Sequence, residues 1–258
     1  MGRLKLEGLV NTRDLGGIAA GGRSVKKGRL LRSGQLFDGT PGDISTLVRE
    51  HGMARVVDFR TDMERDEKPD PDGSYKYYSL PIFTEATFGI THEESGSSMF
   101  ASLVRASRGM TPAEYMVEMY RSMAVSEFSQ AQYGRFFDIL SSASSGATLW
   151  HCSAGKDRAG IAAALVLAAL GADAADIYGD YIITAEYTRD VIEAVKTARL
   201  FPPEAVPFID AFFGVDESYI DGYFSEAKKL CGSVDAYLAE RLGVDDNKRA
   251  CLAQLYLE

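Results

Sequence analysis

Residues 150–160 read WHCSAGKDRAG and join two apolar segments of the chain. The segment at positions 147–150, just before Cys152, is short and mostly apolar, as in a buried strand. The residues after the stretch, up to Leu170, are rich in alanine and leucine and stop before Gly171, which is typical of a buried helix. The pattern therefore predicts a strand, a loop that starts at Cys152, and a helix that follows the loop directly.

A loop in this position lies at a helix N-terminus, where unpaired backbone N–H groups and the helix dipole attract an anion. The same field, together with Lys156 and Arg158, stabilises a thiolate, which is the nucleophilic form of cysteine. Arg158 follows Cys152 by six residues, and its guanidinium can hold an oxyanion through two parallel hydrogen bonds. A nucleophile, a backbone cradle and a guanidinium together indicate phosphoryl transfer through a phosphocysteine intermediate.

Other loops that share some of these residues fit less well. A nucleotide-binding P-loop has glycine where Trp150 stands and Ser or Thr after its lysine, whereas Asp157 follows Lys156 here. A zinc site needs paired Cys or His ligands, and Cys231 and Cys251 have no close partner at such a spacing. We therefore expect neither a metal ion nor an organic cofactor.

The pattern HCxxGKDRxG over residues 151–160 resembles the signature of the cysteine-dependent tyrosine phosphatase superfamily, with its dual-specificity members. It is most similar to the bacterial and fungal tyrosine-protein phosphatases whose signature carries Lys-Asp-Arg. The resemblance extends over nearly the whole chain. It includes the segments NTRDLGG at 11–17, LRS at 31–33, VDFR at 57–60, DY at 180–181 and GSVDAYL at 232–238.

The resemblance implies a role for each residue of the loop. Cys152 is expected to attack phosphorus, and His151 is expected to orient the loop and support the thiolate. The phosphate oxygens are expected to be held by the Arg158 guanidinium and by the backbone N–H groups of the loop, from Ser153, Ala154, Gly155, Lys156, Asp157 and Arg158.

Two aspartates compete for the role of general acid, which protonates the leaving oxygen. Asp157 lies within the loop, and the resemblance implies this residue. Asp58 ends a predicted strand, and ligands of open α/β sheets bind at the carboxyl ends of strands. We prefer Asp157 and keep Asp58 as the alternative. Asp14 is a further candidate, for a brace with Arg13 or Arg60.

Lys156 and Ala159 bear on substrate choice and on turnover. In this family and in related lipid phosphatases, a loop lysine accompanies activity on phosphoinositides; simple electrostatic support of the thiolate is the alternative reading of Lys156. Ala159 stands where such enzymes usually have Thr or Ser, whose hydroxyl assists departure of the thiolate. We therefore expect slow hydrolysis of the phosphocysteine, with accumulation of this intermediate.

Around the loop, predicted strands alternate with helices, and the last third of the chain is helical. Helices are predicted to begin after Thr40 and Thr111, each followed by Pro and, two residues later, by an acidic residue. The sequence thus predicts an α/β fold, with a largely parallel central sheet, helices on both faces and extra C-terminal helices. We expect a single phosphatase domain over residues 1–258, with 83–110 as a lid or insertion and 173–258 as a helical tail packed on the core.

The composition excludes several classes of protein. The 258 residues include 28 basic and 37 acidic ones, a net charge of −9 that disfavours nucleic acid and anionic lipid as partners. Three cysteines do not form a disulfide framework, which favours a reducing compartment. The N-terminal residues lack the apolar core of a signal peptide, and the longest apolar run, Ile161–Leu170, is too short for an integral membrane segment. A cytoplasmic protein is expected, with export by a route that needs no signal peptide left open.

The predicted function is hydrolysis of phosphate monoesters through a phosphocysteine, with inorganic phosphate as the product. Phosphotyrosine in a protein is the leading substrate. A phosphoinositide, or phosphoserine and phosphothreonine in addition to phosphotyrosine, are the alternatives. A weakly active phosphate-binding module is a further alternative, which only Ala159 favours.

Overall fold

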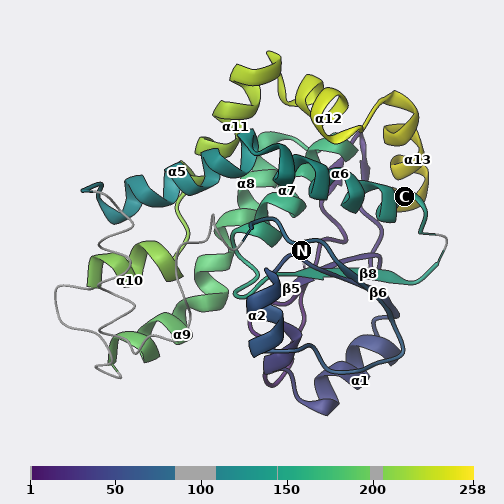
Figure 1. Cartoon of the computed structure of the whole chain (residues 1–258). Helices are drawn as coiled ribbons and strands as arrows, with labels where there is room; N and C mark the ends of the chain where they lie inside the picture. The colour runs from purple at the N-terminus through teal and green to yellow at the C-terminus, as the bar shows by residue number, and fades with distance from the viewer. Residues whose placement is uncertain (1, 85–108, 144, 198–205) are drawn as a thin grey trace.

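A computed structural model describes residues 2–84, 109–143, 145–197 and 206–258, and its centre is a six-stranded sheet (Figure 1). Four neighbouring strands run parallel, and the two short strands at one edge are antiparallel. In their order across the sheet, the strands are β1 (Gly2–Arg3), β2 (Arg13–Asp14), β5 (Leu30–Ser33), β8 (Ala147–His151), β6 (Met53–Asp58) and β7 (Lys76–Ser79). A separate two-stranded sheet pairs β3 (Ala19–Ala20) with β4 (Arg23–Ser24).

Both faces of the parallel strands are covered, and neighbouring residues along each strand contribute to opposite faces. Val56 and Leu149 pack into a smaller cluster with α1 (Pro41–Arg49), whereas Val57 and Trp150 belong to the larger core. Figure 1 shows α1 on one side of the sheet and α6 and α7 on the other. The period of two and the burial of both faces explain why β8 is apolar along most of its length. The prediction of an α/β fold with a largely parallel sheet is confirmed.

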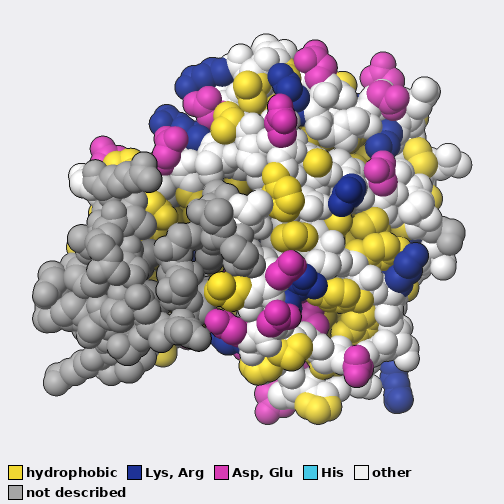
Figure 2. All heavy atoms as spheres, viewed as in Figure 1, with side chains coloured by type: hydrophobic (Ala, Val, Ile, Leu, Met, Phe, Trp, Pro, Cys, Tyr) yellow, Lys and Arg dark blue, Asp and Glu magenta, His cyan; other side chains and the backbone are white. Residues whose placement is uncertain are grey.

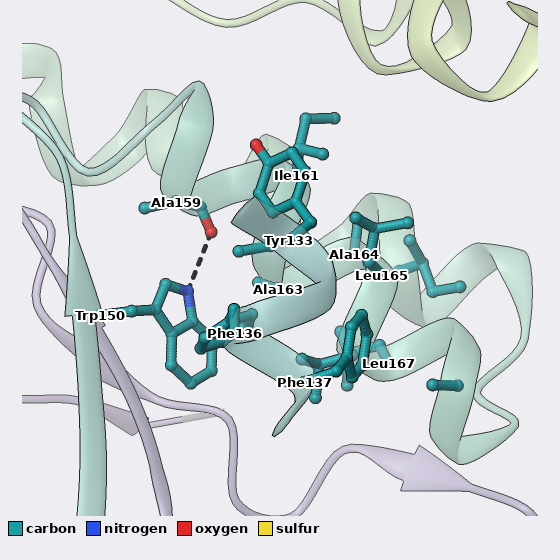
Figure 3. Packing of buried hydrophobic residues seen from close by; sticks show 14 of the residues in the cluster. Tyr133, Phe136, Phe137, Trp150, Ala159, Ile161, Ala163, Ala164, Leu165 and Leu167 are labelled. Atoms are coloured by element: carbon teal, nitrogen blue, oxygen red, sulfur yellow. Dashed lines mark hydrogen bonds between the residues drawn. The ribbon is translucent and has the colours of Figure 1, made fainter. Parts of the chain in front are cut away.

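The larger core is built on α7 (Arg158–Leu170), in which nearly every side chain is buried. Its many alanines let neighbouring elements, including β5 and β8, approach it closely. Side chains of α5 (Pro112–Val125) and α6 (Glu127–Ser141) belong to the same core. The Trp150 ring lies 5.2 Å from that of Phe136, and its indole N–H donates to the Ala159 carbonyl at 3.1 Å (Figure 3). This bond ties the strand before the loop to the helix after it.

The remaining helices form the C-terminal part of the chain, and several of them pack against α5, α6 and α7. The Tyr237 hydroxyl donates to the Ala124 carbonyl at 2.9 Å, and the Tyr256 hydroxyl donates to the Leu140 carbonyl at 2.8 Å. The sequence-based division into one domain with a helical tail stays a prediction. These helices are α8 (Ala174–Ile182), α9 (Thr184–Thr197), α10 (Val206–Phe213), α11 (Glu217–Cys231), α12 (Val234–Leu242) and α13 (Asp246–Tyr256).

The helix starts predicted from local sequence are found. Thr40 and Thr111 are both N-caps with a full capping box, in which the threonine hydroxyl accepts from the third helical N–H and the acidic side chain accepts from the cap N–H. Most of the proposed lid at 83–110 lies outside the described residues. Within the part of the chain that the structure describes, none of the helices has the length and apolarity needed to cross a membrane.

Candidate active site

The loop from Cys152 to Arg158, called the cysteine loop below, leaves the centre of the sheet at the carboxyl ends of the parallel strands. Its first residue follows β8, and its last residue begins α7. In the sheet register His151 pairs with Ser33 of β5 on one side and with Asp58 of β6 on the other. The Cys152 side chain is buried at the base of the loop. Residues from both neighbouring strands are thus available to hold the loop.

Gly155 lets the loop approach the strand beside it. Its φ of +69° is unfavourable for other residues, and a Cβ there would lie 2.2 Å from the Ser33 carbonyl oxygen. The Arg32 guanidinium donates to the Gly155 carbonyl at 2.7 Å, and the Gln35 N–H donates to the Ser153 carbonyl at 3.0 Å. Two carbonyl groups of the loop are thus held by residues that lie outside it.

A buried ion-pair network holds Arg32 in place. Asp180 on α8 accepts from Arg32 at 2.6 Å and from Arg13 at 2.8 Å. Burial, together with the nearby Arg13, lowers the pKa of Arg32 to about 10. Burial alone would raise the pKa of Asp180, but the two guanidinium groups lower it below its usual value. Asn11, at a left-handed φ of 61°, adds a bond from its side-chain amide to the Ala154 carbonyl at 3.1 Å.

The expected pairing of Asp14 with Arg13 or Arg60 is wrong. The Asp14 carboxylate accepts from the backbone N–H groups of Gly16 at 2.9 Å and Gly28 at 2.6 Å. It therefore holds backbone turns. The two arginines have other partners, because Arg13 pairs with Asp180 and Arg60 with Asp58 and Asp70.

Arg158 is held by a glutamate that the sequence did not single out. Both oxygens of Glu64 on α2 (Asp62–Glu67) take part, with distances of 2.6 Å and 2.8 Å to the two terminal nitrogens of Arg158. Burial alone would raise the pKa of Glu64, but the Arg158 charge lowers it to about 2. Burial likewise opposes the charge of Arg158, and Glu64 outweighs it, so the pKa of Arg158 is raised. Glu64 also accepts from the Ser153 hydroxyl. Arg158 is thus fixed at the N-terminus of α7 by a bidentate ion pair with Glu64.

The only sequence signal for Glu64 is the capping box Thr61–Glu64 at the start of α2. That pattern predicts where the helix begins. It contains no information about Arg158, which lies 94 residues further along the chain.

Asp157 keeps some solvent exposure, with a side chain 19% exposed. Its Oδ1 accepts from the Lys156 ammonium at 2.9 Å and from the Tyr120 hydroxyl at 2.7 Å. The Lys156 side chain is only 3% exposed, so its charge lies inside the protein rather than at the surface. The pair brings a cation and a carboxylate together within the cysteine loop.

Asp58 lies in a different environment, fully buried behind the loop. It accepts from the Arg60 side chain at 2.7 Å and from the Tyr77 hydroxyl at 2.7 Å. Burial alone would raise the pKa of Asp58, but the charges of His151 and Arg60 hold it well below its usual range. The sequence predicted that Asp58 ends a strand of the sheet. The structure places it at the carboxyl end of β6 (Met53–Asp58), where it forms an ion pair with Arg60.

His151 lies between two carboxylates. Its Nε2 is 2.8 Å from the Asp70 carboxylate, and its Nδ1 is 3.8 Å from that of Asp58. Burial would lower the pKa of His151, and the two carboxylates outweigh this and raise it. These three side chains are close enough to surround one cation, but Arg60 already donates to both carboxylates. The cluster is therefore balanced by charges of the protein itself.

Ala159 is fully buried and brings no hydroxyl to the loop. Another hydroxyl lies nearby, because Tyr133 donates to the Arg158 carbonyl at 3.1 Å. Burial and, after it, the charge on Cys152 raise the pKa of Tyr133 well above its usual value. The structure thus brings the loop residues expected from sequence together, and adds Glu64 and Tyr120 to them.

Residues 4–258 match the model of the tyrosine phosphatase family. A candidate tyrosine-protein phosphatase of Cupriavidus necator is 32% identical over 252 residues, which cover 94% of this chain and 85% of that protein. The triple specificity protein phosphatase PtpB of Mycobacterium tuberculosis is 28% identical over 264 residues, covering 92% of each chain. A tyrosine-protein phosphatase of Nostoc commune is 44% identical over a shorter stretch of 59 residues, 23% of this chain and 20% of that protein.

Proposed function

The chain belongs to the tyrosine phosphatase family and is a cysteine-dependent protein-tyrosine phosphatase, and from this premise we propose that the cysteine loop is its catalytic centre. The observation that carries the proposal is the position of Cys152. It is buried at the base of a loop that opens onto a helix N-terminus, with the guanidinium of Arg158 fixed beside it by Glu64. This arrangement favours a thiolate and a bound phosphate dianion at the same place.

In the proposed reaction, the Cys152 sulfur attacks phosphorus as the bond to the leaving oxygen breaks. Arg158 and the backbone N–H groups from Ser153 to Arg158 hold the three other oxygens, over which negative charge is spread in the transition state. Asp157 gives its proton to the leaving oxygen. In the second step water attacks the phosphocysteine, Asp157 takes the proton from this water, and the sulfur departs as a thiolate with release of inorganic phosphate.

We assign the general acid to Asp157 because of the contrast with Asp58. Asp157 lies in the loop and is partly exposed, so a substrate can reach it. Asp58 is fully buried, with Arg60 donating to both of its oxygens. A carboxylate that is held ionised in this way has no proton to give. In this proposal Asp58 positions His151, and His151 in turn supports the start of the loop.

The proposed substrate is phosphotyrosine in a protein. Lys156 is buried and bonded to Asp157, which supports a role next to the reacting groups rather than at a second phosphate of an inositol ring. Activity on further phosphate monoesters, including phosphoserine, phosphothreonine or phosphoinositides, is the alternative, since one relative is named a triple specificity phosphatase. On the described part of the face in Figure 2, basic side chains lie among acidic ones, which supports neither nucleic acid nor an anionic membrane as a partner.

The three cysteines are all free thiols, and a nucleophilic thiol must stay reduced. The cytoplasm is therefore our proposed compartment.

Phosphate release from a phosphotyrosine peptide, a phosphoserine peptide and a soluble phosphoinositide, at equal concentrations, tests the proposal. We expect many turnovers on the phosphotyrosine peptide, no activity of Cys152→Ser, and slower release from the other two substrates. Tight binding without turnover would favour a phosphate-binding module instead. Equal rates on all three would replace the tyrosine preference by a broad specificity.

A further inference from the structure

Both hydrogen bonds that the Asp157 carboxylate accepts within the described part of the chain end on the same oxygen. The Tyr120 hydroxyl donates to Oδ1 at 2.7 Å, and the Lys156 ammonium donates to it at 2.9 Å. Tyr120 comes from the middle of α5 and is fully buried. Tyr120, which lies 37 residues away in the sequence, thus contacts the proposed general acid directly.

The direction of the next hydrogen bond follows from the first one. The hydroxyl groups of Tyr120 and Tyr181 are 2.7 Å apart, and either could be the donor by geometry. A tyrosine hydroxyl has one hydrogen, and that of Tyr120 is directed to Asp157. The Tyr181 hydroxyl must therefore donate to Tyr120, which gives a chain of donors from Tyr181 through Tyr120 to Asp157.

Packing fixes the two rings that form this chain. The ring of Tyr120 meets that of Tyr181 edge to face at 6.2 Å, and it lies 5.7 Å from the ring of Tyr219. Gly160 makes room for Tyr181, because a Cβ at this position would lie 3.2 Å from the Tyr181 ring. Tyr181 also follows Asp180, whose partner Arg32 holds the Gly155 carbonyl. Two adjacent residues of α8 thus support the cysteine loop at two points.

We propose that Tyr120 is a positioning residue, which holds Oδ1 of Asp157 so that the transferable proton is carried by Oδ2. A protonated carboxyl group has a single O–H, and an oxygen that already faces two donors is the unfavourable place for it. Fixing Oδ1 therefore selects both the oxygen that gives the proton and its direction. The inference rests on the proposed role of Asp157 as general acid.

The experiment compares two substrates that differ in their need for an acid. The leaving phenol of phosphotyrosine has a pKa of about 10 and needs a proton as it departs. Dinitrophenyl phosphate releases a strongly acidic phenol that departs as the anion. We expect Tyr120→Phe, which keeps the ring, to lower kcat/KM on phosphotyrosine about tenfold and to leave kcat/KM on dinitrophenyl phosphate within about twofold. The comparison uses kcat/KM because this quantity reports the first step, in which the phenol departs, and not the later hydrolysis of the phosphocysteine. Tyr181→Phe should show the same selectivity with a smaller effect.

Tyr256→Phe is the matched control. It also removes a buried tyrosine hydroxyl with a 2.8 Å bond, in this case to the Leu140 carbonyl, and it should leave both rates unchanged. An equal loss of kcat/KM on both substrates in Tyr120→Phe, or no loss on either, would overturn the proposal. The two hypotheses are separated by Cys152→Ser and Asp157→Asn. If Asp157→Asn lowers kcat/KM equally on both substrates while Cys152→Ser is inactive, the assignment of the acid fails rather than that of the nucleophile.

Discussion

Asp58 ends strand β6, and Asp157 lies in the loop after the neighbouring strand β8, so both carboxylates reach the same edge of the sheet. Their environments differ. Arg60 and Tyr77 donate to Asp58, whose side chain is fully buried, whereas Asp157 has donors on one oxygen and retains 19% exposure. The carboxyl ends of the strands place both carboxylates near the site, and the hydrogen-bond partners of each carboxylate decide whether it can exchange a proton. We therefore expect loss of chemistry from changes at Asp157 and loss of stability from changes at Asp58.

The largest effect on turnover is expected for Asp157→Asn. The variant keeps the shape of the side chain but has no acidic proton, so kcat on phosphotyrosine should fall by about 100-fold to 10,000-fold. The free energy of unfolding should fall less than in Asp58→Asn, because the Asp157 carboxylate is partly exposed and the asparagine oxygen can still accept from the buried Lys156. Steady-state kinetics and urea unfolding measure the two quantities. A variant with near-normal turnover would remove the difference between the two aspartates.

Asp58→Asn should have the opposite profile. It leaves the buried Arg60 with Asp70 as its remaining carboxylate partner, and breaking a buried ion pair costs about 3 kcal/mol or more. Urea unfolding should show this loss. Asp62→Asn is the matched control, because its pair with Arg65 is exposed and should contribute little. A stable Asp58→Asn variant that loses leaving-group selectivity would instead make Asp58 the acid.

Glu64→Gln tests the ion pair that holds Arg158 in place. Removing the charge leaves a buried guanidinium poorly compensated, so we expect a loss of about 1.5–3 kcal/mol at neutral pH. We also expect a higher KM for phosphotyrosine, because Arg158 is no longer held in one orientation.

The same variant makes a prediction about pH. The pKa of Glu64 lies at about 2 in the folded protein, against 4.5 for the free group. Its contribution to stability is therefore complete above pH 4.5 and is lost as the pH falls from there toward 2. Unfolding at a series of pH values should show wild type and Glu64→Gln converging in this range. A constant difference between them would contradict the assigned pair.

The smallest change is expected for Ala159→Thr. This variant separates the first step, in which Asp157 acts as an acid, from the second step, in which it acts as a base. The added hydroxyl lies next to the loop and acts on thiolate departure only. We expect the burst of a rapid-quench experiment to shrink and the steady-state rate to rise severalfold. Unchanged turnover would show that hydrolysis of the phosphocysteine is not slow.

Local sequence predicts much of the fold because the responsible forces are local. The capping boxes at Thr40 and Thr111 involve neighbours in the chain, and the apolar composition of α7 is enough to predict a buried helix. The cysteine loop is predictable for the same reason, since nucleophile, cradle and arginine lie within seven residues.

The supports of the loop could not be predicted in this way. Glu64 and Tyr120 are separated from their loop partners by 94 and 37 residues. These contacts depend on where the folded chain places α2 and α5 relative to the loop. Asp14 is a case in which local sequence misled. The neighbouring Arg13 suggested an ion pair, but the Asp14 carboxylate accepts from backbone N–H groups instead.

The central claim is that Cys152 carries the phosphoryl group, and the most direct test is to trap this intermediate. Wild-type protein would be mixed with a phosphotyrosine peptide, quenched in acid within milliseconds, digested and analysed by mass spectrometry. The account predicts phosphate on the peptide that contains Cys152 in wild type, and none in Cys152→Ser. Phosphate on a different residue, or turnover that persists in Cys152→Ser, would contradict it.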